Sequence, residues 1–379
     1  MPVIFLSRLV IENRKGEMRD ENNGNACCFY GGVFFFCGIA TETGIVEARA
    51  ATQQTARHSE TRARGSALRP GDCIGVVAPA SWLEREEWEK GVQLLKKHGY
   101  RVKLAPSCTA ANGFFAGTDS TRASDLNRFF ADDEVKAILC LRGGYGSVRV
   151  LDKLNYTEIA RHPKLLIGFS DITALHAALG EKSGIVTVHG PMLGSLASSN
   201  LTEYTEREFF RGIAADEPLG ALPTPKGAPM KAVVPGEAEG IVMGGNLSIV
   251  LSLIGTPYEL KGDGALLFLE DVDVSSYQID RALYQLWQSG LLHRVNGILF
   301  GAFTGGDDDL DPGDSTTAEV IDYYARLVGK PVIKGVPAGH VSDNAFLPFG
   351  VHAVMKANED GTASLVFDEA AALPPKRAK

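Results

Sequence analysis

Cysteine is scarce in this sequence, with six residues among 379 and none after Cys140. No two of the six are spaced as C-x-x-C, the pattern typical of zinc modules and redox centres. We therefore expect neither a disulfide framework nor a zinc site, and no metal centre is predicted.

Long apolar runs are also missing. The longest, residues 27–40, is interrupted by three glycines, and it is shorter than the ~20 residues that cross a bilayer. The first residues lack the basic and then apolar layout of a signal peptide. We therefore expect a cytoplasmic protein that makes no use of a membrane.

A basic excess is the third absence. The chain has 38 Lys and Arg against 46 Asp and Glu, which gives a formal net charge of -8. Without a positive field to attract phosphate, general binding of nucleic acid is not expected. The hydrophobic fraction of 45% is typical of a globular chain, and a chain of this length usually forms more than one core. We predict two domains that bind a small molecule or a protein.

Regular structure is predicted from about residue 70 onward. Residues 1–65 show no sustained periodicity, and we interpret them as a poorly ordered extension of unknown role. Residues 66–217 then alternate apolar strands with amphipathic helices, the first of which we expect to be capped by Ser81 and Glu84. This alternation predicts an α/β domain with a doubly wound, mostly parallel sheet, in which ligands bind beyond the carboxyl ends of the strands.

A proline-rich stretch follows this domain. Five of the 18 prolines lie between Pro218 and Pro235, so we predict a linker at residues 218–238. Shorter strands and helices in residues 239–370 predict a smaller C-terminal α/β domain. Residues 371–379 have the composition of a solvated tail.

The sharpest local signal is an apolar strand, residues 165–169, that runs into Ser170 and Asp171. A tight turn there would lift the Ser170 hydroxyl out of the sheet, at the positive end of the next helix. The pattern resembles the nucleophile elbow G-x-S-x-G, although Ile172 replaces the second glycine. In the alternative interpretation, Ser170 or Asp171 only caps a helix.

A nucleophilic serine needs a base, and two histidines lie in suitable loops. His340 follows Gly339 in a stretch rich in glycine and proline just past a predicted strand, and His189 is the competitor. His176 falls within a predicted helix, where packing or solvation is expected. A single loop histidine is more often structural than catalytic, so His340 needs support from other residues.

The base needs an acceptor, and two carboxylates end an almost wholly apolar strand at residues 265–269. A charge at Glu270 or Asp271 is costly unless it is paired or functional. The alternative is that both are simply the solvated end of the strand or begin the cap of the next helix. The order Ser170, Glu270, His340 is compatible with a catalytic triad, because triad members meet in space.

A glycine-rich loop at residues 141–147 follows another predicted strand. Its N–H groups could stabilise an oxyanion or bind phosphate, whereas a plain tight turn is the alternative. The Walker spacing and its lysine are absent. Arg142 in this loop is a candidate for binding the terminal carboxylate of a substrate, unless it pairs with an acidic neighbour.

An acidic loop at residues 305–314 suggests calcium, but the spacing is wrong. Counted from Asp307, an EF-hand needs glycine at position 6 and glutamate at position 12. Pro312 and Ala318 occupy these positions. A solvated loop is the better interpretation.

Eight short motifs, each weak alone, occur in one order and together carry a resemblance that covers about residues 68–367. The sequence resembles the LD-carboxypeptidase family, which includes muramoyltetrapeptide carboxypeptidases and microcin C immunity hydrolases. The motifs are Gly75-Val76-Val77-Ala78-Pro79-Ala80-Ser81, Arg142-Gly143-Gly144-Tyr145-Gly146, Gly168-Phe169-Ser170-Asp171, His189-Gly190-Pro191-Met192, Gly244-Gly245-Asn246-Leu247, Gly255-Thr256-Pro257-Tyr258, Leu269-Glu270-Asp271 and Gly339-His340.

The resemblance implies a serine peptidase without metal or organic cofactor. By motif, Ser170 corresponds to the nucleophile, Glu270 to the acid that orients the base, and His340 to the base. The nucleophile belongs to the N-terminal domain and its two partners to the C-terminal domain.

The resemblance also implies an oxyanion hole made of two backbone N–H groups. These belong to Asp171 and to Gly144 or its neighbour Gly143.

The implied reaction is release of the terminal D-alanine from murein tetrapeptide during cell-wall recycling in the cytoplasm, by a homodimer. The runner-up is a microcin-type amidase that acts on peptidyl or aminoacyl nucleotides. A non-catalytic module that binds a sugar or a nucleotide is the alternative from another class.

Overall fold

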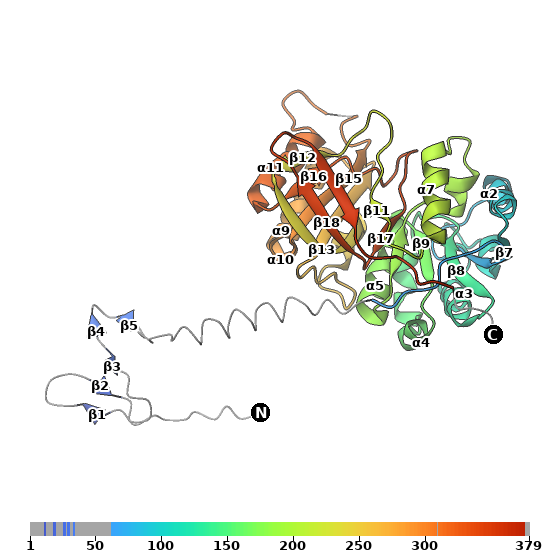
Figure 1. Ribbon diagram of the computed structural model, residues 1–379, viewed down its shortest axis with the longest axis horizontal. Coiled ribbons are helices and arrows are strands. Elements are labelled where there is room, and N and C mark those ends of the chain that lie inside the picture. The colour runs from blue at the N-terminus through green and yellow to red at the C-terminus, as the bar shows by residue number, and fades with distance from the viewer. Residues whose placement is uncertain are drawn as a thin grey trace. The chain divides into compact units, whose positions relative to one another are not determined.

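The computed structural model describes residues 62–308 and 310–375 together with five two-residue strands nearer the N-terminus (Figure 1). The chain divides into two compact units, Met1–Glu60 and Thr61–Lys379. In the first unit, two antiparallel sheets are formed by β1 (Ile11–Glu12), β2 (Met18–Arg19) and β3 (Ala26–Cys27), and by β4 (Phe29–Tyr30) and β5 (Val33–Phe34). Most of the predicted extension and residues 376–379 of the predicted tail lie outside the described residues.

The first sheet of the larger unit has six strands in the order β17-β10-β9-β8-β6-β7. Five of them are parallel, as predicted, and β17 runs antiparallel to β10 at one edge. The strands are β6 (Cys73–Val77), β7 (Arg101–Leu104), β8 (Val135–Cys140), β9 (Leu165–Gly168), β10 (Thr187–His189) and β17 (Leu347–Phe349).

Helices and short 3₁₀ turns connect these strands, so the alternation predicted for an α/β domain is confirmed. The stretch after Gly146 starts as 3₁₀ turns rather than as the expected helix. The elements are α2 (Arg85–Lys97), η1 (Pro106–Thr109), α3 (Asp119–Ala131), η2 (Ser147–Arg149), η3 (Leu151–Lys153), α4 (Tyr156–Arg161), η4 (Ser170–Ile172), α5 (Thr173–Ser183), α6 (Leu193–Ala197) and α7 (Glu203–Ala214).

The second sheet has eight strands in the order β11-β19-β18-β13-β14-β15-β16-β12, of which β13 to β16 are mutually parallel and the others antiparallel. Its strands are β11 (Gly220–Ala221), β12 (Lys231–Val234), β13 (Gly236–Asn246), β14 (Leu266–Val272), β15 (Gly297–Thr304), β16 (Val332–Lys334), β18 (His352–Ala357) and β19 (Ala363–Phe367). Its helices are α8 (Leu247–Leu253), α9 (Ser276–Gln288), α10 (Leu291–Arg294) and α11 (Thr317–Val328).

The proline-rich segment is more than a connection between the domains. It supplies β11 and β12, the two outer strands of the second sheet. The five prolines of this segment all lie outside these two strands, where a missing N–H interrupts no sheet hydrogen bond.

The predicted cap of α2 was wrong. Glu84 caps this helix, and its N–H donates to Glu87 Oε2 at 3.0 Å. Ser81 lies further upstream, where its Oγ accepts a hydrogen bond of 3.2 Å from the N–H of Tyr145. Ser81 therefore positions the glycine-rich loop, and the helix begins only at Arg85.

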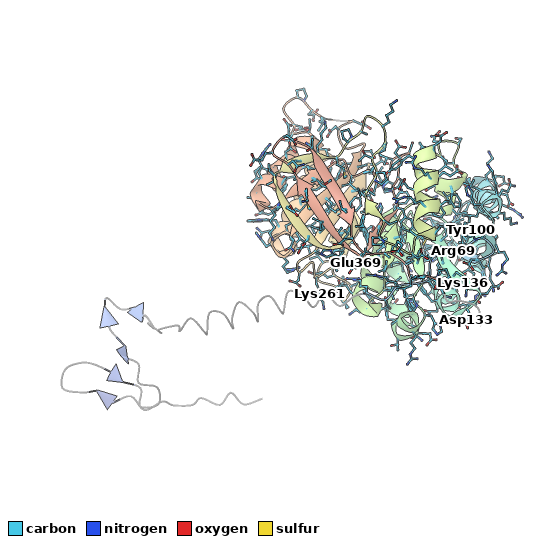
Figure 2. All side chains as sticks on the ribbon, in the orientation of Figure 1. Arg69, Tyr100, Asp133, Lys136, Lys261 and Glu369 are labelled. Atoms are coloured by element: carbon cyan, nitrogen blue, oxygen red, sulfur yellow. The ribbon has the colours of Figure 1, made fainter. Side chains whose placement is uncertain are left out.

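The two ends of the larger unit are fastened to its body. Ala67 donates to the carbonyl of Leu373 at 2.8 Å. Arg64 pairs with Glu369, and Arg69 pairs with Asp216, each at 2.5 Å (Arg69 and Glu369 are labelled in Figure 2). Among the described helices, none is both long and apolar enough to cross a membrane.

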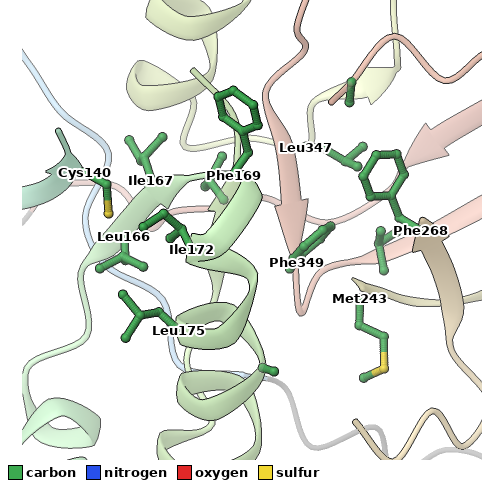
Figure 3. Packing of buried hydrophobic residues seen from close by; sticks show 14 of the residues in the cluster. Cys140, Leu166, Ile167, Phe169, Ile172, Leu175, Met243, Phe268, Leu347 and Phe349 are labelled. Atoms are coloured by element: carbon green, nitrogen blue, oxygen red, sulfur yellow. The ribbon is translucent and has the colours of Figure 1, made fainter. Parts of the chain in front are cut away.

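The two sheets share one hydrophobic core. Figure 3 shows Phe349 of β17 and Phe268 of β14 close together, and their ring centroids are 6.1 Å apart. At the end of β13, the Asn246 N–H donates to Thr173 Oγ1 of α5 at 2.9 Å. These contacts bring the carboxyl ends of β9 and β14 to one place.

Close approach at this junction requires glycine. A Cβ on Gly245, at φ 133°, would lie 2.3 Å from Thr173 Oγ1, whereas one on Gly255, at φ 77°, would meet nothing within 4 Å. Both substitutions force alanine into a left-handed backbone, but only the first also collides with a neighbour.

We therefore expect Gly255→Ala to lower the free energy of unfolding by about 1 kcal/mol and Gly245→Ala by a further ~1 to 3 kcal/mol because of the overlap. Urea unfolding of the two variants measures the difference. Equal losses would contradict the close packing of β13 against α5.

Candidate active site

Ser170 lies in a strained turn between β9 and α5. Its φ of 64° makes it one of two non-glycine residues with a positive φ in the described part of the chain. Such strain persists only where the surroundings enforce it, and it is typical of nucleophile elbows. The turn lifts the hydroxyl above the end of the sheet, as predicted from the strand-to-helix pattern.

The missing second glycine of the elbow has a simple explanation. Ile172 is fully buried and fills the space beside Gly168 (Figure 3). A Cβ on Gly168 would lie 3.0 Å from Ile172 and 3.2 Å from Cys140. Packing therefore requires glycine at position 168. Position 172 can carry a side chain, and Ile172 fills the space there.

Two hydrogen bonds join the three side chains that the sequence singled out. Ser170 Oγ is 2.9 Å from His340 Nε2, and His340 Nδ1 is 2.8 Å from Glu270 Oε2. An ionised carboxylate can only accept, so Nδ1 carries the proton and Nε2 is left to accept from the serine hydroxyl. The imidazole is therefore held in the tautomer that a general base requires.

Glu270 is completely buried at the end of β14. Burial raises the pKa of its carboxyl above the ordinary value, and the hydrogen bond to His340 opposes this rise. Gly339, at φ 122°, allows the loop to lie directly on the carboxylate, because a Cβ there would be 2.7 Å from Oε2. The acid and the loop that carries the base are therefore packed as one piece.

Asp271, the neighbouring candidate, turns to the other side of the strand. It accepts hydrogen bonds from Asn246 Nδ2 at 2.8 Å, from the Ser248 N–H at 2.9 Å and from Ser248 Oγ at 2.7 Å. Side chains alternate along a strand, so only one of the two carboxylates reaches the imidazole. Asp271 instead holds the start of α8, the helix that precedes the strand, and not a cap of the next helix as the alternative proposed.

The other two histidines contact neither Ser170 nor Glu270. His189 is fully buried against Phe268 and Phe349, and its two ring nitrogens have no hydrogen-bond partner within the described residues. Burial lowers its pKa well below the usual value. His176 Nε2 donates to the Gly168 carbonyl at 2.9 Å, and burial lowers the pKa of this imidazole to about 4. Both rings are neutral at pH 7 and belong to the core.

The glycine-rich loop lies against the elbow. A Cβ on Gly143 would be 3.1 Å from Ser170 Oγ and 3.3 Å from the Asp171 nitrogen. The N–H groups of Gly143 and Gly144 donate to no acceptor in the part of the chain that the structure describes. Free backbone donors thus lie close to the serine hydroxyl.

Ser147 ties this loop to the elbow, a link that the sequence did not reveal. Its N–H donates to Asp171 Oδ2 at 2.8 Å, and its hydroxyl donates to the Asp171 carbonyl. Burial raises the pKa of the Asp171 carboxyl. The only signal was a small polar residue directly after Gly146, which is too common to interpret.

Three cavities of about 450, 290 and 390 Å³ are lined by residues next to the site, either by Arg142 of the glycine-rich loop or by Phe169 and His340. Arg142 lines the first two, together with Leu83 and Glu87. His340 lines the third, which shares Ser195 with the second. Arg142 is half-buried and forms no ion pair with another described residue, so the acidic neighbour considered as its alternative partner is not found there.

No group of three or more His, Cys, Asp or Glu side chains within the described residues could hold a metal ion. In the acidic loop, Asp307 Oδ1 accepts from the N–H and the hydroxyl of Thr317 at 2.7 Å each. This carboxylate therefore fixes the start of α11.

A hydroxyl, an imidazole and a buried carboxylate connected in this order, beside free backbone donors, form the arrangement that serine hydrolases use. No organic cofactor is needed for that chemistry.

Comparison with known proteins agrees. Residues 74–190 match the model of the LD-carboxypeptidase N-terminal domain, and residues 239–355 match that of the C-terminal domain. A probable murein peptide carboxypeptidase from Bacillus subtilis (strain 168) is 37% identical over 77% of this chain and 91% of its own length. The chain belongs to the LD-carboxypeptidase family.

Two solved structures are also similar. An MccF-like protein from Bacillus anthracis str. Ames has a TM-score of 0.74 and 28% identity over 80% of this chain and 99% of its own. A muramoyltetrapeptide carboxypeptidase from Oxalobacter formigenes has a TM-score of 0.69 and 26% identity over 80% of this chain and 100% of its own.

The buried His176 makes the stability of the fold depend on pH. Its pKa of about 4 in the folded state lies below the usual 6.5, so the unfolded state binds the proton more readily between these values. Stability is therefore complete above pH 6.5 and decreases as the pH falls toward 4, by about 3 kcal/mol from this group.

We expect His176→Gln to flatten this dependence when urea unfolding is measured between pH 4.5 and 7. Substitution of His352, which pairs with Asp368 at the surface, serves as the control. An unchanged slope in His176→Gln would contradict the assignment of a neutral ring.

Proposed function

We propose that this protein is a serine-type LD-carboxypeptidase that releases the terminal D-alanine from murein tetrapeptide. Membership of the family and the names of the Bacillus subtilis and Oxalobacter formigenes relatives support this substrate. The observation that carries the proposal is the hydrogen-bonded chain from Ser170 through His340 to Glu270, at 2.9 and 2.8 Å.

In this mechanism, His340 takes the proton from Ser170 as Oγ attacks the carbonyl carbon of the scissile amide. Glu270 stabilises the imidazolium that forms, because its carboxylate accepts from Nδ1. His340 then returns the proton to the departing amine of D-alanine, which leaves an acyl-enzyme on Ser170. Water, deprotonated by the same imidazole, hydrolyses this ester.

Two backbone donors would stabilise the tetrahedral oxyanion. We assign the N–H of Asp171 and that of Gly144 or its neighbour Gly143, since this loop lies against Ser170 and its donors are free. Each such donor is worth ~3 kcal/mol of the barrier.

Arg142 is proposed as a residue that binds a carboxylate of the substrate. It lines two cavities next to Gly143 and has no carboxylate partner within the described residues. A half-buried guanidinium is well suited to this task because it can donate two parallel hydrogen bonds to one carboxylate.

A second candidate function is hydrolysis of peptidyl or aminoacyl nucleotides by the same residues. The likeness to the MccF-like protein from Bacillus anthracis supports it. Incubation of the protein with both substrate classes, followed by mass analysis of the products, separates the two activities.

We also propose that the enzyme works in the cytoplasm as a homodimer during peptidoglycan recycling, and that residues 66–217 and 239–370 are its two domains. The matches to the two domain models within these ranges support the division.

The central test is D-alanine release from purified murein tetrapeptide, with tripeptide and pentapeptide as controls. The wild-type protein should release D-alanine from the tetrapeptide alone. Ser170→Ala should retain its circular dichroism spectrum and lose at least about 10⁴-fold in kcat, since the nucleophile is gone. Substantial turnover by this variant would refute the mechanism.

The adjacent carboxylates offer a matched pair. Glu270→Gln should lower kcat by about 10³-fold or more, since an amide no longer stabilises the imidazolium. Asp271→Asn should instead lower the free energy of unfolding by ~1 to 3 kcal/mol, because its amide faces the Ser248 donors, and leave kcat within about tenfold of wild type. Kinetics and urea unfolding of both variants measure the contrast, and a reversed pattern would exclude Glu270 as the orienting acid.

A further inference from the structure

The cavity of about 390 Å³ beside His340 has no role in the mechanism above. It is lined by the imidazole, by Phe169 and by polar side chains that carry no formal charge, namely Ser195, Ser198, Asn200, Thr205, Ser342 and Asn344. Of the three cavities described above, this is the one that His340 lines.

The direction of proton transfer decides which part of the substrate enters this cavity. Nε2 of His340 must come within hydrogen-bond distance of the leaving nitrogen to protonate it. The oxyanion must instead lie near the backbone donors of Gly143 and Asp171. Groups attached to the leaving nitrogen therefore extend toward His340, and the acyl part extends toward the cavities lined by Arg142.

Asn344 provides an oriented donor in the cavity on the His340 side. Its side chain is 3% exposed, and its Oδ1 accepts from the N–H of Gly339 at 3.3 Å. Of the two atoms of the side-chain amide only Oδ1 can accept, so this contact directs Nδ2 the other way. No described residue accepts a hydrogen bond from Nδ2.

The backbone around Asn344 is fixed as well. Its N–H donates to Thr205 Oγ1 at 2.8 Å, and this hydroxyl donates to the Ser342 carbonyl at 2.7 Å. The loop that carries His340 is thereby fastened to α7. An amide donor that has no protein partner and is not sealed from solvent, in a rigid loop four residues after the base, is available to a ligand that enters the cavity.

We infer that this cavity binds the leaving D-residue and that Asn344 Nδ2 donates a hydrogen bond to its terminal carboxylate. This inference rests on the proposed carboxypeptidase function. It assigns recognition of the substrate's terminal carboxylate to an uncharged hydrogen-bond donor. Arg142, which lines the other two cavities, then binds a carboxylate of the acyl part rather than the terminal carboxylate.

The test compares tetrapeptide that ends in D-alanine with the same peptide that ends in D-alaninamide. Asn344→Asp keeps the oxygen that accepts from Gly339 and replaces the donor by a negative charge. We expect kcat/KM for the acid to fall about 100-fold, as for a lost hydrogen bond to a charged group, whereas kcat/KM for the amide stays within about threefold. The ratio of the two values does not depend on the fraction of folded enzyme.

Asn200→Asp is the matched control, because it introduces the same charge at an exposed position of the same cavity. It should change the ratio by no more than about threefold, since water screens it. Arg142→Gln should weaken turnover of the acid and the amide equally.

Equal losses for the acid and the amide in Asn344→Asp would overturn the inference, since the residue would then only position His340. A selective loss of the acid in Arg142→Gln would also overturn it. If wild-type enzyme releases neither D-alanine from the acid nor D-alaninamide from the amide, the carboxypeptidase proposal itself fails. Binding of acid and amide to Ser170→Ala by calorimetry then tests the cavity alone: a preference for the acid that Asn344→Asp removes supports it, and equal affinities refute it.

Discussion

The hydrogen bond between Glu270 and His340 is the interaction on which the rest of the site depends. A carboxylate with no exposure is costly to bury, and it is tolerated only where a donor compensates it. His340 is that donor, and its loop lies against the carboxylate through Gly339. The second sheet and its loops therefore hold Glu270 and His340 in contact with each other. The first sheet contributes only the Ser170 hydroxyl, which must lie within hydrogen-bond distance of His340. The strained turn at Ser170 provides it.

The packing of the two sheets against each other determines where His340 lies relative to Ser170. Phe268 and Phe349 pack across the boundary, and Asn246 is hydrogen-bonded to Thr173 at the start of the helix that follows the elbow. Asp271 holds the same asparagine from the other side. The end of β14 thus carries two carboxylates with different partners. Glu270 accepts from the His340 imidazole, and Asp271 accepts from Asn246 where the two sheets meet. A change in the packing between the sheets would move the base relative to the hydroxyl.

Much of this was accessible from the sequence, for physical reasons. Buried parallel strands are uninterrupted apolar runs, so most strands were predicted, and the order of weak motifs selected Ser170, Glu270 and His340 before their geometry was known. Their catalytic roles stay a prediction. Contacts between distant segments left no local pattern. The sequence therefore gave no reason to place Ser81 against the glycine loop, to find sheet strands in residues 218–235, or to notice Asn344, whose meaning depends on an empty space beside it.

The edge strand β17 has a consequence for how the molecule is made. It completes the first sheet by pairing with β10, yet it follows the loop of His340 and ends at Phe349. On the ribosome, the serine-bearing half is synthesised long before the strand that closes it emerges. The nascent chain must therefore keep that sheet edge unpaired until Leu347–Phe349 has emerged, and the nucleophile meets its base only after His340 has been synthesised.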